Sequence, residues 1–180
     1  MPHLNQIMFN ILLICLLTTL PMARVLALPD DQHQTLELSA DTIDLNQQNQ
    51  HGEYQGHVEL DQGTTHLRAA KAITHTDKHN QLIAAFAYGD PTLPLTHPSH
   101  LVHYWTKTDL EKPILHAWAE IIRYFPHRHR IELIGHASVK QGNDSLVAPK
   151  ICYDTLEQHV LTEHHGKTRT VIIFHPEKQT

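Results

Sequence analysis

Apolar and polar residues alternate along much of this chain. In residues 36–41 and 54–61 the apolar side chains fall on every second position, which is the period of a strand with one buried face. Helical periodicity is hard to find. Further strand-like runs, separated by turn-prone residues, cover residues 82–88, 115–124, 131–139, 146–153, 159–163 and 170–174. Many short strands at this spacing predict an all-β sandwich, barrel or roll.

The chain also contains an internal repeat. The sequence GHVELDQG at residues 56–63 returns as GHASVKQG at residues 135–142, 79 positions later. The same offset, without a gap, pairs Ala40 with Ala119, Asp41 with Glu120, Glu53 with Glu132, Leu67 with Leu146, Ala69 with Ala148 and Lys71 with Lys150. We interpret the halves as two copies of one β unit that stack on each other. Strand glycines mark bulges or close backbone approaches, so the repeated glycines predict places where the sheet bends. A purely structural role for each repeated residue stays open.

The first 27 residues have the features of a secretory signal. An apolar run from Ile7 to Leu20 is too short to span a bilayer and is followed by Pro21 and the small-residue sequence Val25-Leu26-Ala27. We therefore predict a signal peptide at 1–27, cleaved after Ala27, and one domain at 28–180. The run lacks a preceding Lys or Arg, so an uncleaved anchor is the alternative.

Charge and cysteine content exclude some functions. The predicted mature chain carries 13 basic and 19 acidic residues and a formal charge of −6 with histidine neutral, which makes nucleic acid an unsuitable partner. Its one cysteine, Cys152, cannot close an internal disulfide and lies in a strand-like run, so we expect it to be buried and inert. No nucleophile elbow or phosphate-binding loop occurs.

Three stretches carry a resemblance to a known family. These are LELSADTIDL, EYQGHVELDQGTTHLRAAKAITH and GHASVKQGNDSLVAPKICY, which occur in this order between Leu36 and Phe174 behind the predicted signal. Together they resemble the LptA-like, or OstA-like, family of periplasmic lipopolysaccharide transport proteins. The resemblance implies a twisted antiparallel β-jellyroll, an open roll whose apolar interior holds the acyl chains of lipopolysaccharide, without catalysis or a cofactor.

Candidate lipid contacts follow from this expectation and from the alternation. Burying a methylene group is worth roughly 0.8 kcal/mol, so an apolar interior gives enough driving force for acyl chains. The expected inward residues are Leu36, Leu38, Tyr54, Val58, Leu60, Leu67, Phe86, Ile131, Leu133 and Val139. Plain core packing is the alternative for each of them.

The terminal strand suggests how the protein could meet partners. Val171, Ile172, Ile173 and Phe174 form an apolar segment near the C-terminus, and an unpaired edge there would accept a strand from another protein. The segment could instead pair internally. The resemblance implies stacking head to tail with further copies, with an LptC-like inner-membrane subunit and with the N-terminal domain of the outer-membrane translocon LptD.

The 18 histidines raise other hypotheses. Pairs such as His127 and His129 could ligate zinc from one strand face, and with Glu132 they suggest the start of a cupin-like enzyme motif, but the flanking residues do not fit that pattern. We expect no metal site and no enzyme. Histidine-rich loops could make partner contacts sensitive to pH between about 5 and 8. An LptC-like anchored subunit and a structural or adhesive β-domain are the remaining alternatives.

Overall fold

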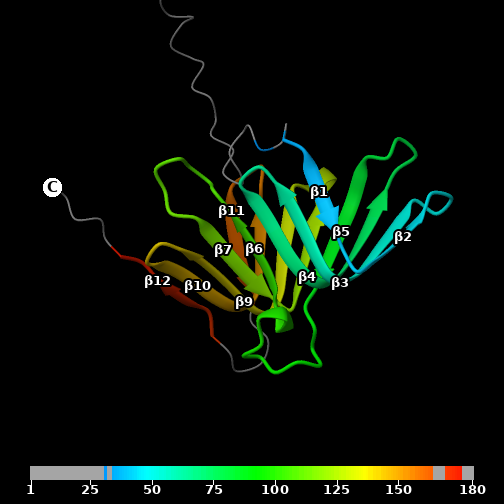
Figure 1. The fold of residues 1–180 in the computed structure, drawn as a ribbon. Coiled ribbons are helices and arrows are strands. Elements are labelled where there is room, and N and C mark those ends of the chain that lie inside the picture. Colours follow the sequence, from blue (N-terminus) through cyan, green and yellow to red (C-terminus); the bar gives the residue numbers. More distant parts are fainter. Residues whose placement is uncertain (1–30, 32–33, 164–168, 176–180) are drawn as a thin grey trace, which may run out of the picture.

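The computed structural model describes residues 31, 34–163 and 169–175, which form antiparallel strands and two short 3-10 helices, η2 (Pro98–His100) and η3 (Pro126–Arg128) (Figure 1). No α-helix occurs in these ranges, and none of their helices is long and apolar enough to cross a membrane. The predicted signal peptide lies outside the described residues. The strands are β1 (Leu36–Ser39), β2 (Thr42–Asn46), β3 (His51–Gln62), β4 (Thr65–Thr76), β5 (Leu82–Tyr88), β6 (Val102–Thr106), β7 (Leu115–Ala119), β8 (Ile121–Phe125), β9 (Arg130–Gln141), β10 (Asp144–Asp154), β11 (His159–Glu163) and β12 (Val171–Ile173).

Four long strands, β3, β4, β9 and β10, each contribute to two layers. One end of β3 pairs with β1 and its other end pairs with β2, while β4 pairs with β6 at one end and with β5 at the other. The first layer therefore has the order β1, β3, β4, β6, β7, β9, β10, β12. The second layer has the order β2, β3, β4, β5, β8, β9, β10, β11. The all-β, antiparallel roll predicted from the sequence is confirmed.

A β-bulge at the repeated Gly-His dipeptide turns β3 and β9 from one layer into the other. Gly56 and His57 have φ values of 75° and 44°, and the register with β4 shifts between Gln55 and Val58. Gly135 and His136 repeat this geometry with φ values of 76° and 47°. Glycine adopts positive φ without steric cost. The bulge bends the strand so that its inward side chains stay inside the roll where the strand passes from one layer into the other.

The strand registers confirm the internal duplication. With the offset of 79, the bounds of β1, β2 and β3 begin where β7, β8 and β9 begin, and β4 begins where β10 begins. Leu36 pairs with Gln62 as Leu115 pairs with Gln141, and the bulges fall at equivalent places. The two halves join where β6 pairs with β7 and β5 pairs with β8. We call these two pairings the internal junction.

The core lies between the layers and is rich in alanine. Its buried residues come from the inward faces of both layers: Val58, Ala69, Ala72, Ala87, Val102, Ala117, Ala119, Ile122, Leu133, Ala137, Ala148 and Ile151. Small inward side chains let two layers approach closely at the middle of the roll. We call the inward surface of both layers the inner face.

The placement of Phe86 corrects one prediction. Phe86 pairs with Ile73 and Arg123, whereas the neighbouring Ala87 pairs with the core residues Ala72 and Ile122. Because paired residues of an antiparallel sheet share a face and neighbours alternate, Phe86 lies on the outer face. It contacts the ring of Phe125 there, with centroids 5.8 Å apart. The run LIAAFAY is apolar throughout, so alternation could not assign its inward residues.

Three features of the strands differ from the sequence predictions. The expected run 115–124 is divided into β7 and β8 at Glu120, whose backbone N–H donates to the carbonyl of Gly135. β6 was not predicted, because VHYWT mixes polar and aromatic residues without a clear period. Within the predicted run 170–174, β12 occupies Val171–Ile173.

Candidate functional site

The inner face collects nine of the ten predicted lipid contacts. Val58 and Leu133 are buried in its core, and Tyr54, Leu67, Ile131 and Val139 pack against that core. Leu38 pairs with Leu60 on the same face, and both are half-buried. Leu36, at the outer end of β1, is 55% exposed. Their contact with lipid stays a prediction, because the structure shows only which face they occupy.

Sequence reasoning missed the middle of this face. The inward alanines, together with Ile122 and Ile151, form most of the buried core. Tyr104 also lies there, and burial raises the pKa of its hydroxyl. The 79-residue offset aligned Ala69 with Ala148 and, two positions earlier, Leu67 with Leu146. Because Leu67 was predicted to face inward, alternation could have marked both alanines as inward as well.

The apolar inner face continues onto the strands at both ends of the roll. At the N-terminal end, Ile43 and Leu45 of β2 are 45% and 63% exposed. At the C-terminal end, Val160 of β11 and Ile172 of β12 are 47% and 54% exposed. Partly exposed apolar side chains beside a strand edge favour addition of another strand.

The predicted partner segment is paired on one side. Val171–Ile173 pairs with Ser145–Val147 of β10, and among the described residues β12 has no second strand partner. β1 likewise pairs with β3 alone within the described part of the chain. In the same described ranges β2 pairs with β3 alone and β11 with β10 alone, so there each layer has one unpaired strand edge at its N-terminal end and one at its C-terminal end.

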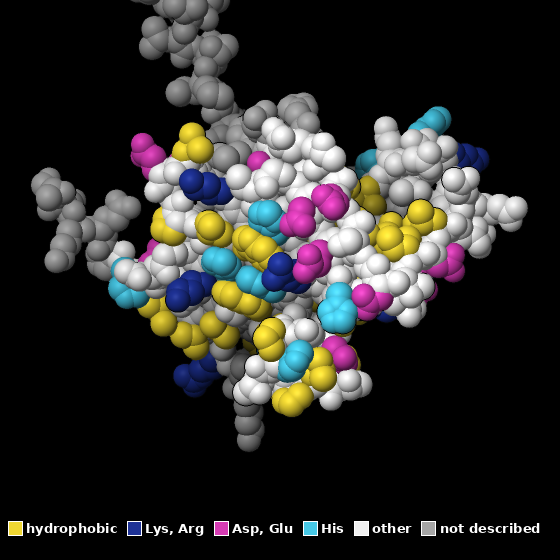
Figure 2. Space-filling model, viewed as in Figure 1, with side chains coloured by type: hydrophobic (Ala, Val, Ile, Leu, Met, Phe, Trp, Pro, Cys, Tyr) yellow, Lys and Arg dark blue, Asp and Glu magenta, His cyan; other side chains and the backbone are white. Residues whose placement is uncertain are grey.

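Stacked rings lie on the outer face of β6 and β7 at the internal junction, and Figure 2 shows histidine and apolar side chains close together over these strands. The rings of His103 and Trp118 stack at 4.8 Å and 8°, and His66 stacks on Trp105 at 5.0 Å. Nε2 of His103 lies 3.1 Å from Nδ1 of His116. Desolvation, and then the charges of neighbouring groups, lower the pKa of His103 to about 4. These rings explain part of the unusual histidine content as packing.

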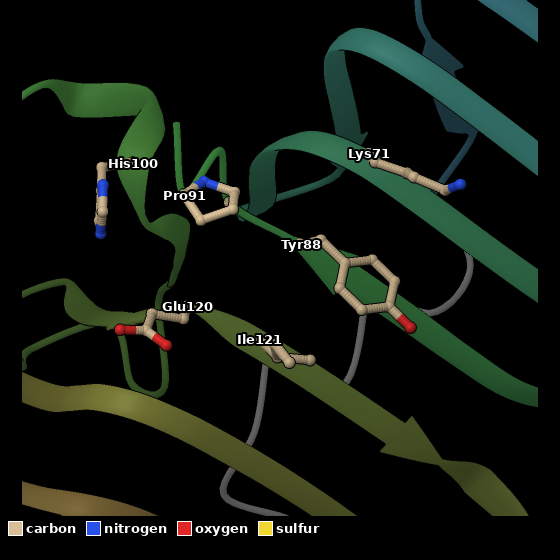
Figure 3. A pocket seen from close by; sticks show the side chains of 7 residues that line it. Lys71, Tyr88, Pro91, His100, Glu120 and Ile121 are labelled. Atoms are coloured by element: carbon tan, nitrogen blue, oxygen red, sulfur yellow. The ribbon is translucent and has the colours of Figure 1, made fainter. Parts of the chain in front are cut away.

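A pocket of about 360 Å³ also lies at the internal junction. Lys71, Tyr88, His100, Glu120 and Ile121 line it, as Figure 3 shows. Its charged groups have partners within the chain: Lys71 pairs with Glu53, Glu120 with His136, and Nδ1 of His100 with the carbonyl of Leu93. Nothing in these contacts indicates a ligand.

The histidines do not converge on a metal centre in the part of the chain that the structure describes. There, no group of three or more His, Cys, Asp or Glu side chains could hold a metal ion. His127 and His129 lie at the exposed turn of η3, where His129 adopts a left-handed conformation.

Comparison with known proteins agrees with this geometry. A family model described as "LptA/(LptD N-terminal domain) LPS transport protein" matches residues 37–159. The chain belongs to this family. The lipopolysaccharide export system protein LptH of Pseudomonas aeruginosa is 29% identical over 145 residues, which are 81% of this chain and 77% of LptH.

A solved structure supports the fold. The crystal structure of LptH, the LptA homologous periplasmic component of the lipopolysaccharide transport device of Pseudomonas aeruginosa, matches with a TM-score of 0.68 and 24% identity, covering 82% of this chain and all of that chain. The β-jellyroll predicted from the sequence is confirmed. As a member of the LptA family, the chain is a lipopolysaccharide transport protein and not an enzyme.

Proposed function

We propose that this protein carries lipopolysaccharide across the periplasm, with the acyl chains on its inner face, as part of a bridge between the inner and outer membranes. The observation that carries this proposal is the continuous inner face: the nine predicted contacts, buried at the middle, lead to half-exposed residues at both ends. Each methylene removed from water contributes roughly 0.8 kcal/mol, so acyl chains suit such a surface.

The periplasmic location rests on the sequence and on family membership. The N-terminal signal at 1–27 directs secretion, and cleavage after Ala27 releases a soluble carrier that begins at Leu28. An LptC-like anchored subunit would instead keep Met1. The N-terminal residue of protein recovered from the periplasm distinguishes the two.

The two ends of the roll are the proposed partner surfaces. An LptC-like inner-membrane subunit and the N-terminal domain of LptD would add strands at the ends of the bridge, and further copies of this chain would stack head to tail between them. Heterologous contacts of this kind extend an assembly in one direction.

The internal junction supplies the register for such stacking. β12 occupies on β10 the place that β6 occupies on β4: Leu146 pairs with Ile172 as Leu67 pairs with Tyr104. β1 is the counterpart of β7, and Tyr104 pairs with Ala117 across the internal junction. By equivalence, Ile172 meets Leu38 of the next copy, and Thr162 of β11 meets its Ile43. The inward pair of Ile172 and Leu38 would continue the apolar inner face from one copy to the next.

Photo-crosslinking in living cells tests lipid binding. A photoreactive residue at Leu38 or Leu60 should give adducts with lipopolysaccharide, whereas the same residue at the adjacent outward positions Ser39 and Glu59 should not. Each control position lies next to its test position on the same strand, but its side chain points to the outer face of the sheet. Equal labelling at inward and outward positions, or none at Leu38 and Leu60 in folded periplasmic protein, would exclude the proposed lipid path.

A further inference from the structure

The outer face of the C-terminal end carries an exposed apolar patch. Val147 of β10 and Val171 and Ile173 of β12 are 44%, 52% and 48% exposed, and Val147 pairs directly with Val171. We call these three residues the outer patch. Figure 2 shows apolar side chains over β10 and β12 at lower left. The patch adjoins the strand edge that the proposed stacking would use.

The internal junction shows what covers the equivalent positions within the chain. Arg68, His103 and Trp105 take the places of Val147, Val171 and Ile173. There, β7 offers Trp118 opposite His103 and His116 opposite Trp105. Cross-strand ring pairs of this kind stabilise neighbouring strands. The outward residues of β6 and β7 that face each other across the internal junction are therefore all aromatic or histidine rings.

A second copy of this chain does not supply such a match. In the register above, Val171 would meet Ser39 and Ile173 would meet Glu37 of the next copy. Glu37 also pairs with Asp61 on its own sheet, so an apolar side chain would face a carboxylate that has a like charge beside it. Polar groups that lose water without gaining a partner weaken an interface.

We propose that the C-terminal end is built for a different protein, whose edge strand presents apolar or aromatic side chains on its outward face as well as its inward face. This inference rests on the proposed stacking register. A second copy still fits on the inner face but leaves the outer patch mismatched, so self-association is the weaker of the two contacts.

Changing the outward residues of β1 tests this proposal. Glu37→Val with Ser39→Val gives the N-terminal end the outward surface that the outer patch should prefer, and both positions are exposed in the single chain. Sedimentation velocity should show self-association at least tenfold tighter than in the wild type. Adding Val171→Ser and Ile173→Ser to the same protein should remove the gain.

Four outcomes would overturn the proposal. Glu37→Gln with Ser39→Thr removes the charge without adding comparable apolar surface, and an equal gain from this control would assign the effect to charge. A gain that survives Val171→Ser and Ile173→Ser would be non-specific. Equal association of the wild type and the valine variant rejects the partner preference alone, while association by neither protein rejects the stacking register and the proposal with it.

Discussion

The repeated Gly-His dipeptide has a structural reason at the level of single residues. In both halves a carboxylate holds the histidine of the bulge: Nδ1 of His57 lies 2.8 Å from Oδ2 of Asp41, and Nδ1 of His136 lies 2.6 Å from Oε1 of Glu120. A Cβ atom at Gly56 would come within 2.2 Å of Oδ2 of Asp41. The repeat therefore preserves the bend that joins the two layers.

Substitution of this glycine should be costly. We expect Gly56→Ala to lower the free energy of unfolding by about 1–3 kcal/mol, because alanine is strained at a φ of 75° and its Cβ would collide with Asp41. Urea denaturation measures the loss. Asp41→Ala in the same protein should recover part of it by removing the closest contacts. A loss below about 0.5 kcal/mol, the range of an ordinary surface change, would contradict this account.

His103 should make the stability of the protein depend on pH. Burial, followed by the charges of His116 and Arg68, lowers the pKa of His103 to about 4. Between pH 6.5 and about 4 the unfolded chain binds a proton there that the folded chain excludes, so the free energy of unfolding falls as the pH falls through this window. His103→Gln should reduce the loss between pH 7 and 5.

The ring signal of His103 gives a direct check. Its NMR titration midpoint should lie well below 6.5. Unfolding measured at several pH values should show that the free energy of unfolding falls more steeply with falling pH in the wild type than in His103→Gln. His57 acts in the opposite direction, because the hydrogen bond with Asp41 raises its pKa. Its stabilising contribution is present at low pH and is lost as the pH rises. Equal pH dependence of the wild type and the variant would exclude His103 as a cause.

At the level of elements, equivalent strands have different outward surfaces. β7 and β1 start from equivalent positions, yet β7 carries His116 and Trp118 where β1 carries Glu37 and Ser39. The first pair packs inside a continuous sheet, and the second lies at the end of the molecule. The same backbone unit thus forms a permanent contact in one half and an exposed end in the other.

This difference predicts unequal effects of matched substitutions. Trp118→Ala should lower the free energy of unfolding by about 2 kcal/mol, because it removes a half-buried ring that stacks on His103. Ser39→Ala at the equivalent place should change it by less than about 0.5 kcal/mol. Thermal and urea unfolding would measure both. Similar losses would mean that the ring stack does not stabilise the internal junction.

At the level of the whole molecule, the duplication makes the ends complementary. Each layer starts with a strand that has an internal counterpart, β1 for β7 and β2 for β8, and finishes with one that also has a counterpart, β12 for β6 and β11 for β5. The chain therefore contains, at its own centre, the geometry of the contact that we propose between copies.

Cysteine crosslinking tests that register. In a Cys152→Ala background, protein with Leu38→Cys mixed with protein carrying Ile172→Cys should form a disulfide-linked dimer on oxidation, because directly opposite residues bring their Cβ atoms close enough. Ser39→Cys mixed with Ile172→Cys should link far less, since its side chain lies on the other face. Equal yields would show that copies meet in another register or not at all.

The sequence by itself determined much of this protein. Alternation gave the all-β class, the 79-residue offset gave two equivalent halves, and nine of the ten residues predicted to face inward do so, because both the period and the offset can be read directly along the chain. Only the tertiary structure decided which face Phe86 takes, since its run is apolar throughout and its face depends on pairing with Ile73 and Arg123. The equivalence of β6 and β12 also required it: their sequences differ, and only their shared place on β4 and β10 reveals it.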